Sequence, residues 1–172
     1  NPERGFSFQA EGPLDMRMGP DVRRTAEDIL ATYPEERLSD IFHEYGEERY
    51  SRRIASAIVK VRKEHPLRTT TQLASLVRSV IGKREADSRI HPATRVFQAL
   101  RIEVNEELGQ LETALEAALE HLRPGGRLVA IAFHSLEDRI LKTTFRHWAA
   151  TCVCPPRQPV CNCDKRAEVT VL

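Results

Sequence analysis

The sequence lacks several features that would place it in a special class. It has no apolar run close to the ~20 residues that span a bilayer, and no basic segment followed by an apolar one of the kind that directs secretion. It also has no internal repeat and no low-complexity tract. These absences argue against a membrane, secreted or repeat protein, and we expect a soluble protein of the bacterial cytoplasm.

The composition is that of a folded domain. The chain has 172 residues, of which 41% are hydrophobic and 30% charged, enough for a core in one domain or in two small ones. It begins at Asn1 without a methionine and ends in the apolar stretch Glu168–Leu172, which has the pattern of a strand. We therefore expect a fragment of a longer protein, with further strands of the same sheet outside this chain.

The net charge of +1 hides a segregation of charge along the chain. Residues 47–101 carry 13 Lys and Arg against 5 Asp and Glu, a net +8, whereas residues 1–46 carry 5 against 10, a net −5. A basic block inside a nearly neutral protein indicates a polyanionic partner for that block, and nucleic acid is the leading candidate.

The stretch Leu122–Arg139 has the pattern of one α/β crossover unit. Pro124 ends a helix, two glycines form a turn, and the apolar run Leu128–Phe133 is typical of a strand covered on both faces. A helix over about 136–150 is expected to follow. In open parallel sheets ligands bind at the carboxyl ends of strands, so the polar residues just after this run occupy the place of an active site.

These polar residues are His134, Ser135, Glu137 and Asp138, and two interpretations apply to them. Ser135 followed by Asp138 is close to a helix-capping box, and acidic residues favour the first turn of a helix. His134 is not explained as a cap, although a lone histidine at the end of a strand is more often structural than catalytic. The two interpretations are compatible, since a cap also orients a site.

Helical patterns account for most of the remaining chain. Capping residues, prolines and glycines bound four helices before residue 82, and apolar spacings of three and four predict one long helix that tolerates Gly109. A charged loop, Gly82–Ile90, separates the fourth helix from the long one. The expected ranges are Ala26–Tyr33 with Thr25 as N-cap, Pro34–Tyr45, Glu47–Glu64, Gln72–Ile81 after a Thr69–Thr71 cap, and Pro92–His121.

The third of these helices is the best candidate for a basic surface. Its cationic residues recur at spacings of four, seven and three, so they share one face beside an apolar stripe. Such a face is suited to phosphate contacts, and a solvated helix face with ion pairs is the alternative. The candidate RNA-binding residues are Arg49, Arg53, Lys60 and Lys63, extended by Arg78, Lys83, Arg84, Arg89 and Arg95.

All four cysteines fall within twelve residues, as two Cys-x-Cys pairs separated by a proline-rich loop. Four thiols this close suggest a tetrahedral zinc site, which would be structural because four thiolates leave no open coordination position. The one-residue gaps are tighter than the usual C-x-x-C, so reduced free thiols are an alternative, and a disulfide pair is a third that a cytosolic compartment disfavours. The candidate ligands are Cys152, Cys154, Cys161 and Cys163.

Several long strings, spread from Arg4 to about Lys142, carry a resemblance to a known family. They are Arg4-Gly-Phe-Ser-Phe-Gln9, Gly12-Pro-Leu-Asp-Met-Arg-Met18, Ile54-Ala-Ser-Ala-Ile-Val59, Thr69-Thr-Thr-Gln-Leu-Ala74, the stretch His91–Leu108 and the stretch Pro124–Arg139. In this order they resemble the MraW/RsmH family. Its members are bacterial methyltransferases that modify N4 of a cytidine in the decoding region of small-subunit (16S) ribosomal RNA.

The resemblance implies an α/β fold, namely the class I (Rossmann-like) fold of S-adenosylmethionine-dependent methyltransferases. This chain would be the C-terminal part of that fold, with an inserted all-helical substrate-recognition domain. Residues 1–20 would then be the connecting turn segment from the methyltransferase core, and residues 21–90 the helical RNA-recognition domain. Residues 91–172 would be the C-terminal part of the core, with a Cys-rich loop at 152–163.

The resemblance also implies S-adenosyl-L-methionine as cofactor, bound mainly by residues outside this chain. In that family the donor lies on a glycine-rich loop after the first strand, upstream of the Arg4-Gly-Phe-Ser7 string. The sequence here shows no strand–glycine-loop–helix element, so no donor-binding residue can be assigned. We expect the isolated chain to be inactive.

Methylating the exocyclic amine of cytosine requires N4 to be held in line with the methyl group and its N–H to be accepted by an oxygen. The target base would be reached in a single-stranded or extruded conformation. No motif singles out one general base. The candidate catalytic residues are His134, Ser135, Asp138, Asp15 and Arg17.

The expected partner is small-subunit ribosomal RNA or the assembled small ribosomal subunit, without a membrane. The oligomeric state stays open, with a dimer among the alternatives. Two other functions stay open as well: a non-catalytic helical RNA-binding module, and a zinc-stabilised interaction protein.

Overall fold

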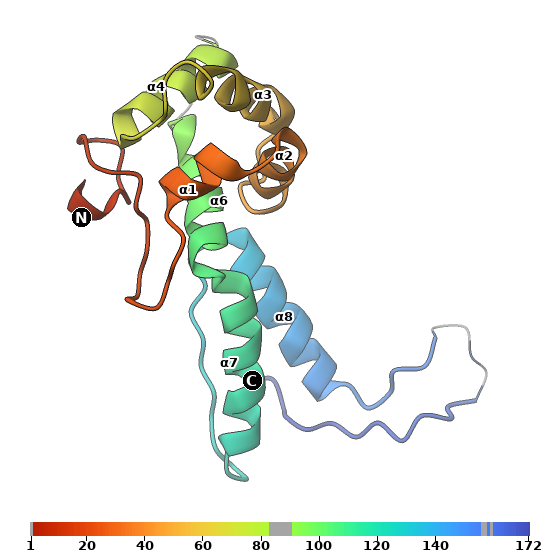
Figure 1. Ribbon diagram of the computed structural model, residues 1–172. Coiled ribbons are helices and arrows are strands. Elements are labelled where there is room, and N and C mark those ends of the chain that lie inside the picture. Colours follow the sequence, from red (N-terminus) through yellow and green to blue (C-terminus); the bar gives the residue numbers. More distant parts are fainter. Residues whose placement is uncertain (1, 83–90, 156–157, 159) are drawn as a thin grey trace. The chain divides into compact units, whose positions relative to one another are not determined.

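The computed structural model describes residues 2–82, 91–155, 158 and 160–172 of the chain. Its helices belong to two units, one up to Glu107 and one from Leu108 onward (Figure 1). Each unit has its own apolar core and is described by itself. The described elements are the 3₁₀ turn η1 (Pro2–Arg4) and the helices α1 (Ala26–Thr32), α2 (Glu35–Glu44), α3 (Ser51–Val61), α4 (Thr70–Ile81), α6 (Ala93–Asn105), α7 (Glu107–His121) and α8 (Ser135–Ala149).

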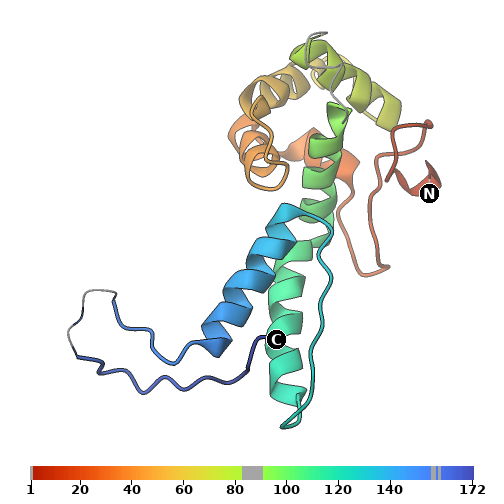
Figure 2. The same cartoon turned by 180° about the vertical axis from the view of Figure 1, so that it is seen from behind.

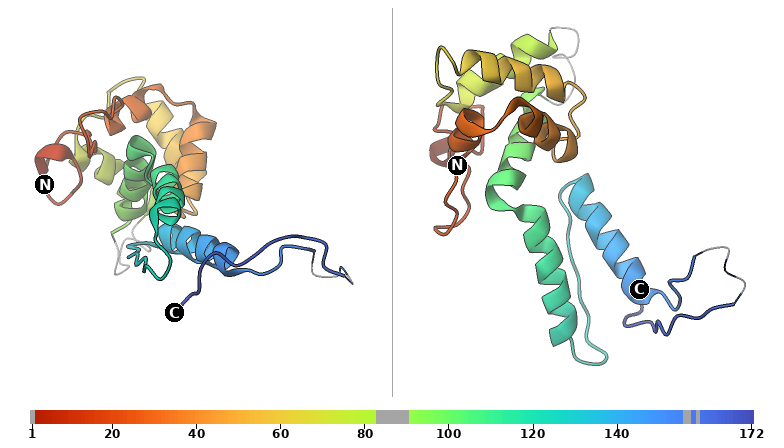
Figure 3. Two further views of the ribbon diagram at one scale, coloured as in Figure 1. Left: turned by 90° about the horizontal axis from the view of Figure 1, so that it is seen from below. Right: turned by 45° about the vertical axis from the view of Figure 1, so that its right-hand side comes forward.

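Helix α6 is central to the first unit. It packs against α1, α2 and α4, and α3 packs on α2 and α4 (Figures 2 and 3). Val96 and Leu100 of α6 are fully buried, as are Ile54 and Ile58 of α3. The apolar spacings of three and four in the sequence are the positions that face this core.

Two capping boxes begin helices where the sequence predicts them. The Thr25 hydroxyl accepts the N–H of Asp28, while the Asp28 carboxylate accepts the N–H of Thr25. Thr69 and Gln72 make the same exchange at the start of α4. Each box satisfies backbone N–H groups that the first turn of a helix leaves unpaired, and the predicted caps are confirmed.

The predicted third helix and the predicted long helix differ from the structure. Glu47 adopts a left-handed conformation with φ 49°, so the chain turns there and α3 begins at Ser51, and α3 ends at Val61 instead of residue 64. Glu106, with φ 52° and ψ 36°, ends α6 as a left-handed cap and divides the expected helix 92–121 into two. Hydrophobic spacing carries no signal for such a cap, which is usually Gly or Asn.

The irregular residues before α1 are held by backbone hydrogen bonds. Pro13 forms an isolated antiparallel bridge with Thr69, and the N–H of Leu14 donates to the carbonyl of Arg68 at 3.1 Å. Gly5 has φ +74°, and a Cβ at this position would lie 2.1 Å from the carbonyl oxygen of Pro13. Only glycine therefore permits the backbone at residue 5 to come this close to the backbone at Pro13.

Asn105 ties the same loop to α6. Its Oδ1 accepts the N–H of Met18 at 2.7 Å, and its Nδ2 donates to the carbonyls of Met16 and Arg101, both at 2.8 Å. The residue is 4% exposed. Because buried backbone groups must find partners inside the protein, the position of the loop depends on this side-chain amide.

The second unit is built on α7 and α8. Leu115 of α7 packs with Leu141 and Trp148 of α8, and two extended segments add Leu128 and Val169 to the same cluster. The first of these segments runs along α7 in Figures 1 and 2. The second returns to α8, where the N–H of Glu168 donates to the carbonyl of Trp148 at 2.8 Å.

Neither predicted strand is formed within the described residues. The run Leu128–Phe133 is extended without a strand ladder, and Val129, Ile131 and Phe133 are 84%, 78% and 87% exposed. Its alternate residues Leu128 and Ala132 pack against the helical core. The expected strand at residues 168–172 is likewise extended only. The two strand predictions are therefore not confirmed within the described residues, because a strand needs a neighbouring backbone and these residues provide none.

The boundary between the two units places α6 with the preceding helices. The sequence analysis instead divides the chain by function at residues 20 and 90, and that division stays a prediction. Within the described ranges, no helix combines the length and the apolar character needed to cross a membrane.

Replacing Asn105 is predicted to destabilise the first unit. Asn105→Ala removes a buried amide that pairs three backbone groups, and we expect a loss of about 2 kcal/mol in the free energy of unfolding. Ser75→Ala, at an exposed position of α4, is the control and should change stability by less than about 0.5 kcal/mol. Urea denaturation of the whole protein measures both, and equal stabilities of the two variants would contradict the role given to Asn105.

Candidate functional site

The loop Leu14–Met18 presents the first pair of predicted catalytic residues. Arg17 donates from Nε to Oδ1 of Asp15 at 2.7 Å and from Nη2 to Oδ2 at 2.9 Å, a two-pronged ion pair. This hydrogen bonding holds the pKa of Asp15 below its usual value. The Asp15 side chain is 30% exposed, so the structure gives an ionised carboxylate that solvent or a ligand can reach.

The backbone of this loop is unusually well fixed. Met16 is 1% exposed with φ 62°, a left-handed conformation that a residue with a side chain rarely adopts. The carbonyls of Leu14 and Asp15 accept the N–H groups of Glu27 and Ala26, at 2.7 and 3.0 Å, and so complete the start of α1. Backbone strain of this kind persists only where the surroundings impose it, and it is concentrated at functional sites.

The start of α8 holds the second group of predicted catalytic residues. The structure assigns the N-cap to His134, which is extended at φ −148° and ψ 167° and whose Nδ1 accepts the N–H of Glu137 at 3.4 Å. The prediction that Ser135 is the cap is therefore wrong, as is the view that capping does not explain His134. Ser135 is the first residue of the helix and is exposed, and Asp138 pairs with Lys142 at 2.7 Å one turn along α8.

The imidazole of His134 also carries an unsatisfied nitrogen. With Nδ1 as an acceptor, the proton of a neutral ring lies on Nε2, which is buried without a hydrogen-bond partner among the described residues. The Oε1 of Glu137 lies 3.5 Å from Nε2, and the Oε2 of Glu137 accepts the N–H of Phe133 at 2.7 Å. The sequence analysis placed Glu137 in this polar group and in the first turn of the helix, but it did not pair Glu137 with His134, although a spacing of three is the signal of a reciprocal cap.

The five catalytic candidates thus belong to two groups along the chain. Asp15 and Arg17 belong to the first unit, whereas His134, Ser135 and Asp138 belong to the second. Their joint contribution to one site stays a prediction. Asn105, which positions the Asp15 loop, was missed by the sequence analysis because helical periodicity does not distinguish a buried amide from a buried apolar residue.

The predicted basic surface centres on α3. Arg53 donates to the carbonyl of Val80 at 2.8 Å, near the end of α4, so it contributes to the fold as well as to the surface charge. The guanidinium groups of Arg49 and Arg53 lie 5.8 and 5.4 Å from the ring centre of Tyr50. A cation and an aromatic ring in contact are typical of single-stranded nucleic-acid binding, and equally of a packed surface.

The other basic candidates differ in their exposure and in their hydrogen-bond and ion-pair partners. Lys60 and Lys63 are exposed, and they have no acidic partner within the described ranges. Arg78 is exposed on α4, and Arg95 of α6 donates to the carbonyl of Glu47 at 3.3 Å. Lys83, Arg84 and Arg89 lie outside the described residues.

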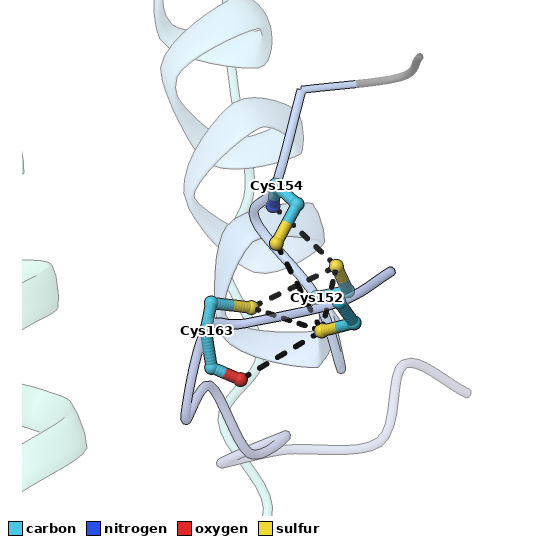
Figure 4. Close-up of side chains that lie close together, drawn as sticks. Cys152, Cys154 and Cys163 are labelled. Carbon is cyan, nitrogen blue, oxygen red and sulfur yellow. Dashed lines mark hydrogen bonds between the residues drawn. The ribbon is translucent and has the colours of Figure 1, made fainter. Parts of the chain in front are cut away.

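The four cysteine thiols gather in one cluster (Figure 4). The Sγ atoms lie 3.5 Å apart for Cys152 and Cys161, 3.8 Å for Cys154 and Cys161, 3.6 Å for Cys161 and Cys163, and 3.7 Å for Cys163 and Cys152. All four lie within 4.8 Å of one another. They are free cysteines, since a disulfide requires sulfurs about 2.05 Å apart. The backbone N–H of Val153 helps to lower the pKa of Cys163 to about 6.

Comparison with known proteins identifies the family to which this chain is similar. The family model described as "MraW methylase family" matches residues 1–172. A relative from Syntrophotalea carbinolica, named "Ribosomal RNA small subunit methyltransferase H", is 55% identical over 98% of the chain and 54% of its own length. Relatives of the same name from Geobacter sulfurreducens and Thermomicrobium roseum are 56% and 55% identical, over 99% and 100% of the chain.

The chain spans about half the length of these curated relatives. The match nevertheless covers the Asp15 loop, the helices of the first unit, the start of α8 and the cysteine cluster. This chain belongs to the MraW methylase family.

Proposed function

We propose that the protein containing this chain transfers a methyl group from S-adenosyl-L-methionine to N4 of a cytidine in small-subunit ribosomal RNA, in the bacterial cytoplasm. The observation that carries the proposal is the match of the whole chain to relatives named as small-subunit ribosomal RNA methyltransferases. The free RNA or the assembled small subunit is the proposed substrate. A carboxylate held ionised on a fixed loop is the structural feature that suits this chemistry.

The fold proposed for the whole protein is the class I α/β fold. The run Leu128–Phe133 supports it, because Leu128 and Ala132 pack on the helical core while Val129, Ile131 and Phe133 are exposed. Exposed apolar residues in alternation indicate a surface that another part of a protein covers. We infer that the segment is a strand of a sheet whose other strands lie outside this chain. The helices within residues 21–90 would form the inserted substrate-recognition domain, and α6 would belong to the core.

The methyl donor is not assigned to residues of this chain. S-adenosyl-L-methionine supplies a methyl group on a sulfonium and is bound in such folds on a glycine-rich loop between a strand and a helix. The described residues contain no such element. The turn at Gly125 precedes an extended segment instead of following one.

The residues of this chain would act on the cytosine. The lone pair of its exocyclic amine is delocalised into the ring, so the N–H groups need an acceptor as N4 becomes a nucleophile. The carboxylate of Asp15 is ionised and reachable, and Arg17 fixes its orientation. The Nε2 of His134 is a donor without a partner in the described structure, and we propose that it positions a carbonyl oxygen or ring nitrogen of the substrate.

The direct test of the function uses the whole protein with S-adenosyl-L-methionine and small ribosomal subunits, followed by mass spectrometry of the RNA nucleosides. We predict one new methyl group, on N4 of a cytidine. The isolated 172-residue chain is the matched comparison, and we predict that titration calorimetry shows no binding of S-adenosyl-L-methionine to it. Methylation at another base would contradict the proposed specificity, and tight donor binding by the isolated chain would contradict the placement of the donor site.

Substitutions of His134 are predicted to separate capping from action on the substrate. His134→Ala removes the N-cap and should cost about 1 kcal/mol of stability. His134→Asn keeps a side chain that caps helices well, and it should restore that stability. If Nε2 positions the base, both variants should slow single-turnover methylation roughly tenfold, the equivalent of one lost hydrogen bond. A normal rate in the Asn variant would reduce His134 to a helix cap.

Two lysines test the basic surface without disturbing the fold. We predict that the double variant Lys60→Ala, Lys63→Ala weakens RNA binding by the whole protein. It should also flatten the slope of log K against log[salt] by about 1.4, because each phosphate contact on single-stranded RNA contributes about 0.7. The control, Arg123→Ala with Arg127→Ala, removes the same charge from exposed positions of the second unit. Equal slopes in the two double variants would identify Lys60 and Lys63 as ordinary surface residues.

A further inference from the structure

The described residues of the segment between α8 and the C-terminal residues form no apolar core of their own. Its large apolar side chains Val153 and Val160 are 52% and 74% exposed. Contact with the rest of the second unit is made near its end, where Glu168 bonds to the last turn of α8 and Val169 packs with Trp148. A segment of this length that buries so little apolar surface needs another source of stability to keep one conformation.

The cysteine cluster is placed to supply that stability. A regular tetrahedron of thiolates around a metal, with bonds of about 2.3 Å, has sulfur–sulfur edges of about 3.8 Å. Four of the six distances between Sγ atoms run from 3.5 to 3.8 Å, and all six lie within 4.8 Å. Such spacings are close to the edges that the ligands of one tetrahedral ion require.

Backbone groups also support thiolates at this place. The N–H of Val153 donates to Sγ of Cys163 at 3.4 Å, and the N–H of Cys154 donates to Sγ of Cys152 at 3.4 Å (Figure 4 shows the latter). The two N–H···S bonds therefore fix the direction of one sulfur in each Cys-x-Cys pair. Such outer contacts orient metal ligands and tune their charge.

We propose that Cys152, Cys154, Cys161 and Cys163 bind one Zn²⁺ ion in a closed, structural site. Sulfur atoms that all lie within 4.8 Å of one another suit a single ion, since the thiolates of an iron–sulfur cluster are bound to separate irons. A tetrahedral four-sulfur site accepts zinc or iron, and zinc binds such ligands more tightly than ferrous iron. With four thiolates and no open position, the ion closes the loop between the two Cys-x-Cys pairs and takes no part in methyl transfer.

The metal content of the whole protein tests this directly. Purified without added metal or chelator, it should contain about one zinc per chain by elemental analysis, released when a mercurial blocks the thiols. Chelation should expose the segment to trypsin at Lys165 and Arg166, and added Zn²⁺ should restore protection. Absence of metal, iron in place of zinc, or an intact mass showing a disulfide would each overturn the proposal.

A pair of double variants identifies the ligands. Cys161→Ser with Cys163→Ser should lose the bound zinc, whereas Val153→Ser with Val160→Ser, which adds serines to the same segment at non-ligand positions, should keep it. Cobalt titration of the unmodified apoprotein provides a measurement independent of variant folding, because tetrahedral thiolate ligation gives cobalt intense absorption bands. Equal zinc content in both variants, or cobalt without thiolate bands, would contradict the site. Methylation is measured separately, so failure here leaves the proposed function untouched.

Discussion

The three hydrogen bonds of the Asn105 side chain are the interaction on which the first unit most depends. They join the end of the central helix α6 to a loop that has no regular structure of its own. The same loop supplies the carbonyls that complete the first turn of α1. The amide itself is buried, so its groups must be paired inside the protein, and these bonds help to fix the path of the chain around Asp15.

This arrangement explains how the ionised carboxylate of Asp15 can lie on a loop and still have a fixed position. Asp15 and Arg17 flank the buried, left-handed Met16, so their side chains point away from the core while the backbone between them is anchored in it. A hydrogen-bond acceptor that positions a substrate needs a fixed backbone and an accessible side chain, and this loop provides both. His134 differs, since one ring nitrogen caps α8 and the other is buried without a hydrogen bond, 3.5 Å from Oε1 of Glu137.

The second unit shows how far a strand depends on its surroundings. Leu128 and Ala132 find apolar partners on α7 and α8, but the alternate residues Val129, Ile131 and Phe133 have none in this chain. The apolar run alone could not distinguish a strand from an extended segment, because the difference lies in hydrogen bonds to a neighbouring backbone. The pattern of exposure is nevertheless that of a strand with one face covered.

The sequence by itself determined the features that depend on neighbouring residues. The capping boxes at Thr25 and Thr69, the approximate helix ranges and the clustering of the cysteines all follow from short-range spacing, and the family follows from ordered strings of residues. Only the tertiary structure decided the breaks at Glu47 and Glu106, the cap at His134 and the pairing of Asn105 with Met16 and Met18. It also brought the four cysteine sulfurs to within 4.8 Å of one another. Some of these features depend on contacts between residues that are far apart in the sequence. The others depend on a backbone conformation that packing imposes against local preference. Hydrophobic periodicity encodes neither.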